Sequence, residues 1–302
     1  MSDDRDLMAD EQALRGSVGA VRTDREVIEV AGPDAATFLQ GQLSQDVAGL
    51  AEGASAWTFV LHPDGKVAVW GRITRLGPDR FVFDVDAGAG AALVARLERF
   101  KLRVDATIAP LDWQVVALRG PDAPSVDVGD AVTADPEWPS AHGVDLLGPA
   151  PTVPEGVRWC APEVLEVLRI ESGVPAMGAE LDEHTIPAES GVVERSVSFT
   201  KGCFTGQELT ARIDSRGGNV PRHLRGLLIA GSVPPVGAEV LVDDEVVGAI
   251  TSAAPGAAGH GGGVALAYVK RSVDPPAAAT VRWGEGEARG EVRPLPLLPL
   301  AG

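Results

Sequence analysis

The chain is short of cysteine, of positive charge and of long apolar runs, and each shortage excludes a class of protein. Its two cysteines, Cys160 and Cys203, are too few for a disulfide framework or a four-cysteine metal cage. The 26 basic residues are outnumbered by 43 acidic ones, and the resulting net charge of −17 argues against a protein that coats nucleic acid. No apolar run approaches the roughly 18 to 20 residues of a membrane-spanning helix.

Neither a secretory signal nor a metal-binding pattern is present. The start of the chain, MSDDRDLMADEQAL, lacks the basic stretch and apolar core of a signal peptide, so we expect a cytoplasmic protein with both thiols reduced. The histidines form no HExxH pair or cluster of ligands, and nothing in their spacing predicts a metal site. They are His62, His142, His184, His223 and His260.

Length and composition predict a chain of several packed units built from short elements. At 302 residues it is at the upper limit for one hydrophobic core. Its 36 glycines and 23 prolines favour many turns over long helices, and 45% hydrophobic residues exclude a wholly disordered chain.

The first hundred residues predict a mixture of strands and helices in α+β layers rather than a regular βαβ winding. Pro33 and Asp34 open a short helix whose apolar face contains Phe38, Leu39 and Leu43. Alternating or helical hydrophobic spacing predicts strands at 26–30 and 80–86, a hairpin of 56–61 with 66–76, and a helix over 88–102.

The remainder divides into an irregular part, a helix and a β-rich end. Residues 122–154 are rich in Pro, Gly, Ala and Asp and are interpreted as an irregular insert, and 162–172 is predicted to be a helix that ends at Gly173. Short apolar runs separated by turn residues then predict a small β-barrel or sandwich, with a boundary near residue 222. The runs are Leu227–Ile229, Val240–Val242, Val246–Ile250, Val264–Tyr268, Thr280–Trp283 and Glu291–Arg293.

The segment most suited to chemistry surrounds Cys203. We expect a strand containing Val197 and Phe199, a loop in which Gly202 and Gly206 flank the cysteine, and then a helix. Glycines allow a ligand to approach the backbone closely, and a thiol near a helix N-terminus and a lysine is favoured as a thiolate. The alternative is a buried, inert cysteine in a tight turn.

Charge reverses in the same part of the chain. Residues 201–225 contain two acidic residues and five basic ones, a net charge of +3 in an acidic protein. Such a segment suits an anionic ligand, but its arginines could equally pair with acidic groups of the protein itself. The basic residues are Lys201, Arg212, Arg216, Arg222 and Arg225.

The residues Lys201-Gly202-Cys203-Phe204-Thr205-Gly206-Gln207-Glu208 resemble the K-G-C-[YF]-x-G-Q-E signature of the YgfZ-type folate-binding proteins. These proteins are a branch of the glycine-cleavage T-protein (aminomethyltransferase) superfamily. Residues 32–47 resemble the N-terminal motif of the family, Leu168–Gly173 its central R-x-E-x-G motif, and Val247–Ser252 part of its C-terminal barrel.

The resemblance implies an α+β fold, in which cloverleaf T-protein-like folate-binding lobes and a small C-terminal β-barrel surround a hole for tetrahydrofolate or a reduced derivative. We therefore expect residues 1–16 to be a disordered tail, 17–222 the two-lobed folate-binding region and 223–302 the barrel domain. Carried over by motif, Glu171 grips the pterin edge, because a carboxylate can accept two adjacent N–H donors.

The implied site residues fall into two groups. Cys203 is the candidate reactive thiol, with Lys201 beside it. The candidate cofactor-binding residues are Glu171, Arg169, Trp70, Gln207 and Arg212.

One position departs from the family pattern. The strand after the hairpin turn carries a catalytic aspartate in T-proteins, whereas here Val69 or Trp70 occupies that place. Nothing in the strand could act as a base, which argues against T-protein turnover. Trp70 could be part of the core or a flat wall for the pterin.

Three functional hypotheses remain after the sequence analysis. The resemblance implies a tetrahydrofolate-binding accessory protein in the maturation or repair of iron–sulfur enzymes, including those that thiolate tRNA. Its partners would be such enzymes or their assembly factors. The alternative is a folate-dependent aminomethyl or one-carbon transferase. Direct RNA contact through residues 201–225 is the least favoured, given the acidity of the chain.

Overall fold

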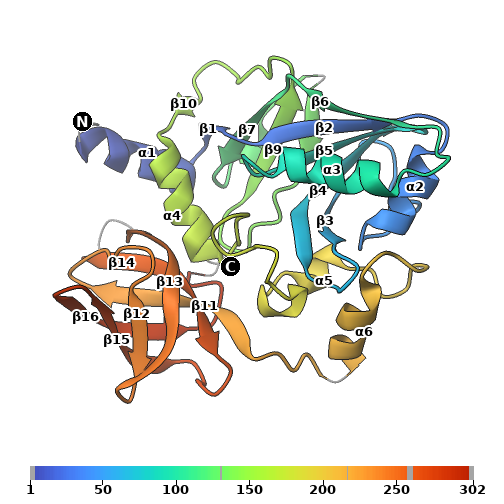
Figure 1. The fold of residues 1–302 in the computed structure, drawn as a ribbon. Coiled ribbons are helices and arrows are strands. Elements are labelled where there is room, and N and C mark those ends of the chain that lie inside the picture. Colours follow the sequence, from blue (N-terminus) through green and yellow to red (C-terminus); the bar gives the residue numbers. More distant parts are fainter. Residues whose placement is uncertain (1–3, 130, 216, 257–260, 299–302) are drawn as a thin grey trace.

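Two five-stranded sheets and a closed six-stranded barrel form the protein in a computed structural model that describes residues 4–129, 131–215, 217–256 and 261–298. His260 and Arg216 lie outside the described residues. Helix α4 (Pro162–Ser172) lies between the barrel and the sheets (Figure 1) and contacts both of them as well as helix α1 (Asp4–Gly16). The expected α+β fold with a C-terminal barrel is confirmed.

The first sheet carries helices on one face. Helices α2 (Ala35–Gln42) and α3 (Gly90–Phe100) cover it, and their Leu39 and Leu93 pack on Phe81 and Phe83 of the sheet. The alternation of residues 80–86 thus gives the face that was predicted. In order across the sheet, the strands are β3 (Ser55–Leu61), β4 (Val67–Gly77), β5 (Arg80–Val85), β2 (Glu26–Ala31) and β6 (Thr107–Leu111).

The second sheet packs against the uncovered face of the first, where Val27 and Val82 meet Val115 and Leu147. Three short helices, η1 (Ala123–Ser125), η2 (Pro187–Glu189) and α5 (Val193–Ser196), and the longer α6 (Gln207–Ser215) lie in the connecting segments. The strands of the second sheet, in order, are β10 (Arg158–Trp159), β1 (Gly19–Thr23), β7 (Gln114–Arg119), β9 (Gly143–Gly148) and β8 (Val132–Ala134).

The barrel contains all six strands that the apolar runs predicted, and it begins at Arg222. Its interior is filled by alternating aliphatic side chains such as Leu227, Val240 and Val281. In order around the barrel, the strands are β11 (Arg222–Ala230), β14 (Gly262–Lys270), β13 (Glu245–Pro255), β12 (Glu239–Val242), β15 (Ala277–Trp283) and β16 (Gly286–Arg293).

The expectation that residues 1–16 form a disordered tail is wrong for the described residues 4–16, which form helix α1. Leu14 of this helix is buried against α4 and β1. Its apolar stripe is interrupted by buried Asp10, whose carboxylate accepts hydrogen bonds from Arg158 Nε and the backbone N–H of Ala161, at 2.6 and 2.8 Å. These partners are distant in sequence, so local polarity gave the wrong prediction.

Two further expectations fail, the first of them also because of a buried charge. The insert 122–154 contains strands β8 and β9, and β9 pairs along its length with β7. Asp145 interrupts the apolar run of β9 and hides the strand. The strand predicted around Val197 and Phe199 is absent from these described residues, which instead follow helix α5 as an irregular segment.

Alternating arginines and aspartates join the two sheets. Arg119 bonds to Asp145 at 2.7 Å, and Asp145 also accepts from Arg72 at 2.8 Å. Arg72 bonds in turn to Asp84 at 3.1 Å, and Arg25 bonds to Asp84 at 2.6 Å. Burial disfavours the charge on Asp145, but Arg119 and Arg72 outweigh it and hold the pKa of that carboxyl below its usual range.

Arg25 extends this series to Asp86, 2.5 Å away. We call the six residues from Arg119 to Asp86 the ion-pair chain. Arg72, Asp84 and Asp145 are at most 5% exposed, so each charge depends on its partners rather than on water.

We predict that Asp145→Asn lowers the free energy of unfolding by about 3–5 kcal/mol at neutral pH, because it leaves buried Arg119 without a carboxylate and buried Arg72 with Asp84 alone. The carboxylate contribution is complete above the unfolded pKa of about 3.9 and is lost as the pH falls from there through the lower folded pKa. The free energy of unfolding, measured with urea, should therefore fall more steeply below about pH 4 for the wild type than for the variant.

The matched control is Glu291→Gln, which removes an exposed pair with Arg293 and should change stability by less than about 1 kcal/mol. A stability of Asp145→Asn equal to that of the control would contradict a structural role of the ion-pair chain.

Candidate functional site

Cys203 is exposed on a loop that Lys201 fixes to the end of helix α2. Lys201 Nζ donates hydrogen bonds to the backbone carbonyls of Gln40, Leu43 and Gln45, at 2.6, 2.7 and 2.9 Å. Burial lowers the pKa of Lys201 to about 8, and Asp46 opposes the shift. With three acceptors already bound to its ammonium group, Lys201 positions the loop rather than facing solvent beside the thiol.

The hairpin turn between β3 and β4 packs against the same loop. A side chain on Gly206, whose φ is +82°, would lie 2.5 Å from the carbonyl oxygen of His62. A side chain on Gly65, at φ +86°, would meet Leu209 Cβ at 2.5 Å. Gly206 is therefore required for contact between two parts of this chain, whereas nothing lies within 4 Å of the corresponding position on Gly202.

Three segments that the sequence analysis singled out separately thus converge. Residues 40–45, the turn at 62–65 and the segment 201–209 contact one another, and their common product is an exposed thiol on a braced loop. The interpretation of Cys203 as a buried, inert cysteine is wrong. Phe199 nearby is also 47% exposed.

Gln207 and Arg212 have local roles in helix α6. Gln207 Oε1 accepts from the backbone N–H of Phe204 at 3.1 Å, and Arg212 forms an exposed pair with Glu208. Neither residue lines the cavities described below. Their roles toward a cofactor stay predictions.

Glu171 and Arg169 are buried on helix α4, and they hold it to its neighbours. Glu171 is 0% exposed and accepts from Arg15 Nη2 of α1 at 2.7 Å. Arg169 bonds to Glu180 at 3.0 Å and to Ser252 of the barrel at 2.7 Å. Neither side chain lines a cavity described below, so the grip of Glu171 on a pterin remains a prediction without support from this geometry.

The strand that was expected to lack a catalytic acid contributes Val69 to the core at 0% exposure and Trp70 to a second layer. Trp70 stacks on Trp57 with ring centroids 4.1 Å apart, and its Nε1 donates to Ser196 Oγ at 2.9 Å. Trp70 does not line the central cavity described below, but it packs on Trp57, which does.

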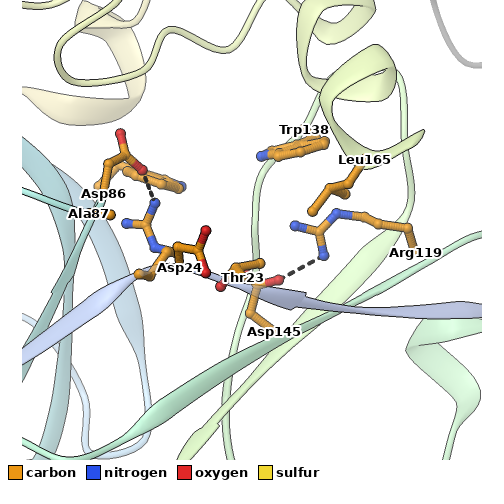
Figure 2. A pocket seen from close by; sticks show the side chains of 10 residues that line it. Thr23, Asp24, Asp86, Ala87, Arg119, Trp138, Asp145 and Leu165 are labelled. Atoms are coloured by element: carbon orange, nitrogen blue, oxygen red, sulfur yellow. Dashed lines mark hydrogen bonds and ion pairs between the residues drawn. The ribbon is translucent and has the colours of Figure 1, made fainter. Parts of the chain in front are cut away.

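A cavity of about 250 Å³ lies between the sheets, and Arg25, Asp86, Arg119 and Asp145 of the ion-pair chain line it; we call it the central cavity. Trp57 and Trp138 contribute aromatic surface, and Leu165 of α4 closes one side. In Figure 2, Asp24 lies between Asp86 on one side and Arg119 with Trp138 on the other. The central cavity thus combines flat apolar surface with groups of both charges.

The polar groups of the central cavity can serve a ligand. Asp24 is exposed and makes no hydrogen bond or ion pair with any residue in the described part of the chain. Arg119 is 2% exposed, and its guanidinium carbon lies 4.5 Å from the ring centroid of Trp138. Its Nε has no hydrogen-bond partner among residues 4–129, 131–215, 217–256 and 261–298. A carboxylate acceptor and a guanidinium donor therefore face the same space.

Sequence reasoning missed every residue of the central cavity. A signal was present: Arg72, Asp84 and Asp145 are charged residues inside otherwise apolar strands, a pattern typical of buried ion pairs. The positions of Asp24 and Trp138 had no comparable signal, because both lie in connections between strands.

Two negative findings apply to the described residues. They contain no group of three or more His, Cys, Asp or Glu side chains placed to hold a metal ion. No helix among them has both the length and the apolar character needed to cross a bilayer.

Residues 5–135 match the family model described as the GCVT N-terminal domain. The chain is 29% identical over 251 residues to the tRNA-modifying protein YgfZ of Cronobacter sakazakii, covering 72% of this chain and 73% of that protein. It is 30% identical over 242 residues to the mitochondrial iron–sulfur cluster assembly factor IBA57 homolog of Neurospora crassa, covering 72% of this chain and 55% of that protein.

Among solved structures, the glycine cleavage system aminomethyltransferase T from Bartonella henselae matches with a TM-score of 0.80. The match covers 97% of this chain and 89% of the other at 21% identity, and it therefore concerns the fold.

We predict that the two thiols differ sharply in reactivity. Cys160 is 8% exposed, and burial raises its pKa to about 11, with Asp10 adding to the shift. Iodoacetamide at neutral pH should alkylate Cys203 in the folded protein and Cys160 only after unfolding, because the thiolate is the nucleophile and needs access. Peptide mass spectrometry measures both, and equal rates in the folded protein would contradict the prediction.

Proposed function

The chain belongs to the YgfZ-type branch of the GCVT superfamily, and from this premise we propose that it is a tetrahydrofolate-binding accessory protein in the maturation or repair of iron–sulfur enzymes. Enzymes that modify tRNA by thiolation would be among its clients. The names of the YgfZ and IBA57 relatives support this assignment.

The exposure of Cys203 is the observation that carries the proposal. Its loop is braced by Lys201, Gly206 and Gly65, so the exposed thiol is held in a defined position. A thiolate is a soft ligand for iron and a nucleophile toward sulfur. One cysteine cannot hold a cluster alone, so a cluster handled here as substrate requires ligands from a second chain or an exogenous thiol.

The central cavity fits the chemistry of a reduced pterin. Trp138 offers aromatic surface to the ring, the carboxylate of Asp24 can accept from its N–H groups, and Arg119 can donate to its carbonyl oxygen. When bound, tetrahydrofolate would supply the ring nitrogen that carries one-carbon groups. The residues of this chain would orient the ring and exclude water from its faces.

The transferase alternative is disfavoured by the same region. Strand β4 offers Val69 in the core, Trp70 bonded to Ser196 and Arg72 within the ion-pair chain. None of these side chains is a base for aminomethyl transfer. The carboxylates of the central cavity come from other elements: Asp86 and Asp145 are paired with arginines, and Asp24 lies in the connection between β1 and β2 rather than on β4, where T-proteins carry their aspartate.

We predict that Cys203→Ser leaves the fold intact but fails to restore iron–sulfur enzyme activity in cells that lack the native chain. The serine keeps the size and exposure of the side chain but cannot ligate iron or carry sulfur. Cys160→Ser, which changes the buried thiol, is the matched control and should restore activity if it folds. Full restoration by Cys203→Ser would remove the thiol from the proposed function.

We also predict that Asp24→Asn and Trp138→Ala each raise the Kd for tetrahydrofolate at least about tenfold, since each removes a charged hydrogen bond or an aromatic contact. Calorimetric titration under anaerobic conditions measures this. Asp112→Asn and Trp159→Ala change exposed residues outside the central cavity and should keep the wild-type Kd within about twofold. Unchanged affinity in both cavity variants would exclude the central cavity as the folate site.

A further inference from the structure

A second cavity, of about 320 Å³, lies where the barrel meets the rest of the molecule. We call it the barrel cavity. The end of helix α4 contributes Ser172, the segment before Cys203 contributes Arg195, and strand β11 contributes Arg225. Residues 294–296, which follow the last strand, close it. Nothing in the proposed function uses this space.

Arg225 is a half-buried guanidinium without a counter-ion. It forms no hydrogen bond or ion pair through its side chain with any part of the chain that the structure describes. Burial lowers its pKa, and Asp274, which forms no ion pair with it, opposes the shift only in part. Since removing a charge from water without a partner is unfavourable, Arg225 retains a capacity to bind an anion.

Two more donors in the barrel cavity lack partners. Ser172 is 2% exposed, and its hydroxyl has no partner among the described residues. Arg195 Nη1 donates to the backbone carbonyl of Glu137 at 2.6 Å, but its Nε has no partner in the same part of the chain. Unsatisfied donors that are buried around one cavity are uncommon in folded proteins and indicate a missing acceptor.

The acidic groups of the barrel cavity do not neutralise these donors. Glu137 and Glu194 both line it, but within the described residues neither forms an ion pair within 4 Å of Arg195 or Arg225. Both residues are exposed, so water screens their attraction to the two arginines. The contact from Arg195 goes to the Glu137 backbone instead.

We propose that the barrel cavity is an anion-binding site in which Arg225, Ser172 and Arg195 hold a carboxylate or phosphate group. An oxygen anion supplies the acceptors that all three side chains lack, and a guanidinium can bind two of its oxygens at once.

The anion has two possible sources. One is a free phosphate or carboxylate metabolite. The other, which rests on the proposed function, is the γ-glutamyl tail of the folate. Trp138 lines the central cavity, while its neighbours Glu137 and Pro139 line the barrel cavity, so the segment 137–139 lines both spaces.

Titration calorimetry with inorganic phosphate and with glutarate tests the site directly. The wild type should bind at least one probe saturably, and Arg225→Gln and Ser172→Ala should each weaken binding at least about tenfold. Arg282→Gln, a barrel arginine outside the cavity, is the control. Because Arg225 has no structural partner, its variant should keep the wild-type melting temperature.

A second arm compares tetrahydrofolate carrying one and three γ-glutamyl residues. Tighter binding of the longer form that disappears in Arg225→Gln would identify the folate tail as the anion, whereas Arg225-dependent binding of phosphate alone would identify a free anion. If no probe binds, or if binding survives in Arg225→Gln, the proposal is overturned. Failure of both folates to bind, with phosphate or glutarate still bound, would instead overturn only the folate part of the proposed function.

Discussion

Buried charges joined in series, from Arg119 through Asp145, Arg72, Asp84 and Arg25 to Asp86, determine how the two sheets meet. Apolar packing alone would let the sheets close on each other, but charges at this depth are stable only with their partners in place. Ion pairs therefore fix the charged residues that line the central cavity, and these residues lie beside the tryptophans that line it. The same constraint holds Arg119 beside Trp138 with one donor still available.

The cavity wall is also linked to the thiol loop by packing. Trp57 lines the central cavity and stacks on Trp70, which donates a hydrogen bond to Ser196. Arg195, which lines the barrel cavity, has its guanidinium carbon 5.4 Å from the Trp70 ring centroid. Ser196 precedes the braced loop by a short segment. The central cavity and the barrel cavity thus share one layer of contacts, and Phe204, next to Cys203, packs against the hydrophobic cluster that contains Trp57 and Trp70.

Much of the fold could be predicted from the sequence, because the barrel strands, α4 and the 80–86 strand each have regular hydrophobic periods. Two of the failures share a cause: α1 and β9 contain buried charged residues, Asp10 and Asp145, whose partners are distant in sequence. At the site, the glycines around Cys203 indicated an unusual loop correctly. Glu171 was placed by motif alone, and its contact with Arg15 could not be foreseen from a segment that looked like a solvated tail.

The central claim is that a reduced pterin occupies the central cavity. A crystal structure of the protein with tetrahydrofolate bound tests it most directly. The account predicts the pterin ring against Trp138 in the central cavity, with a ring N–H donating to Asp24. A ring bound elsewhere, with the central cavity filled by solvent, would contradict it.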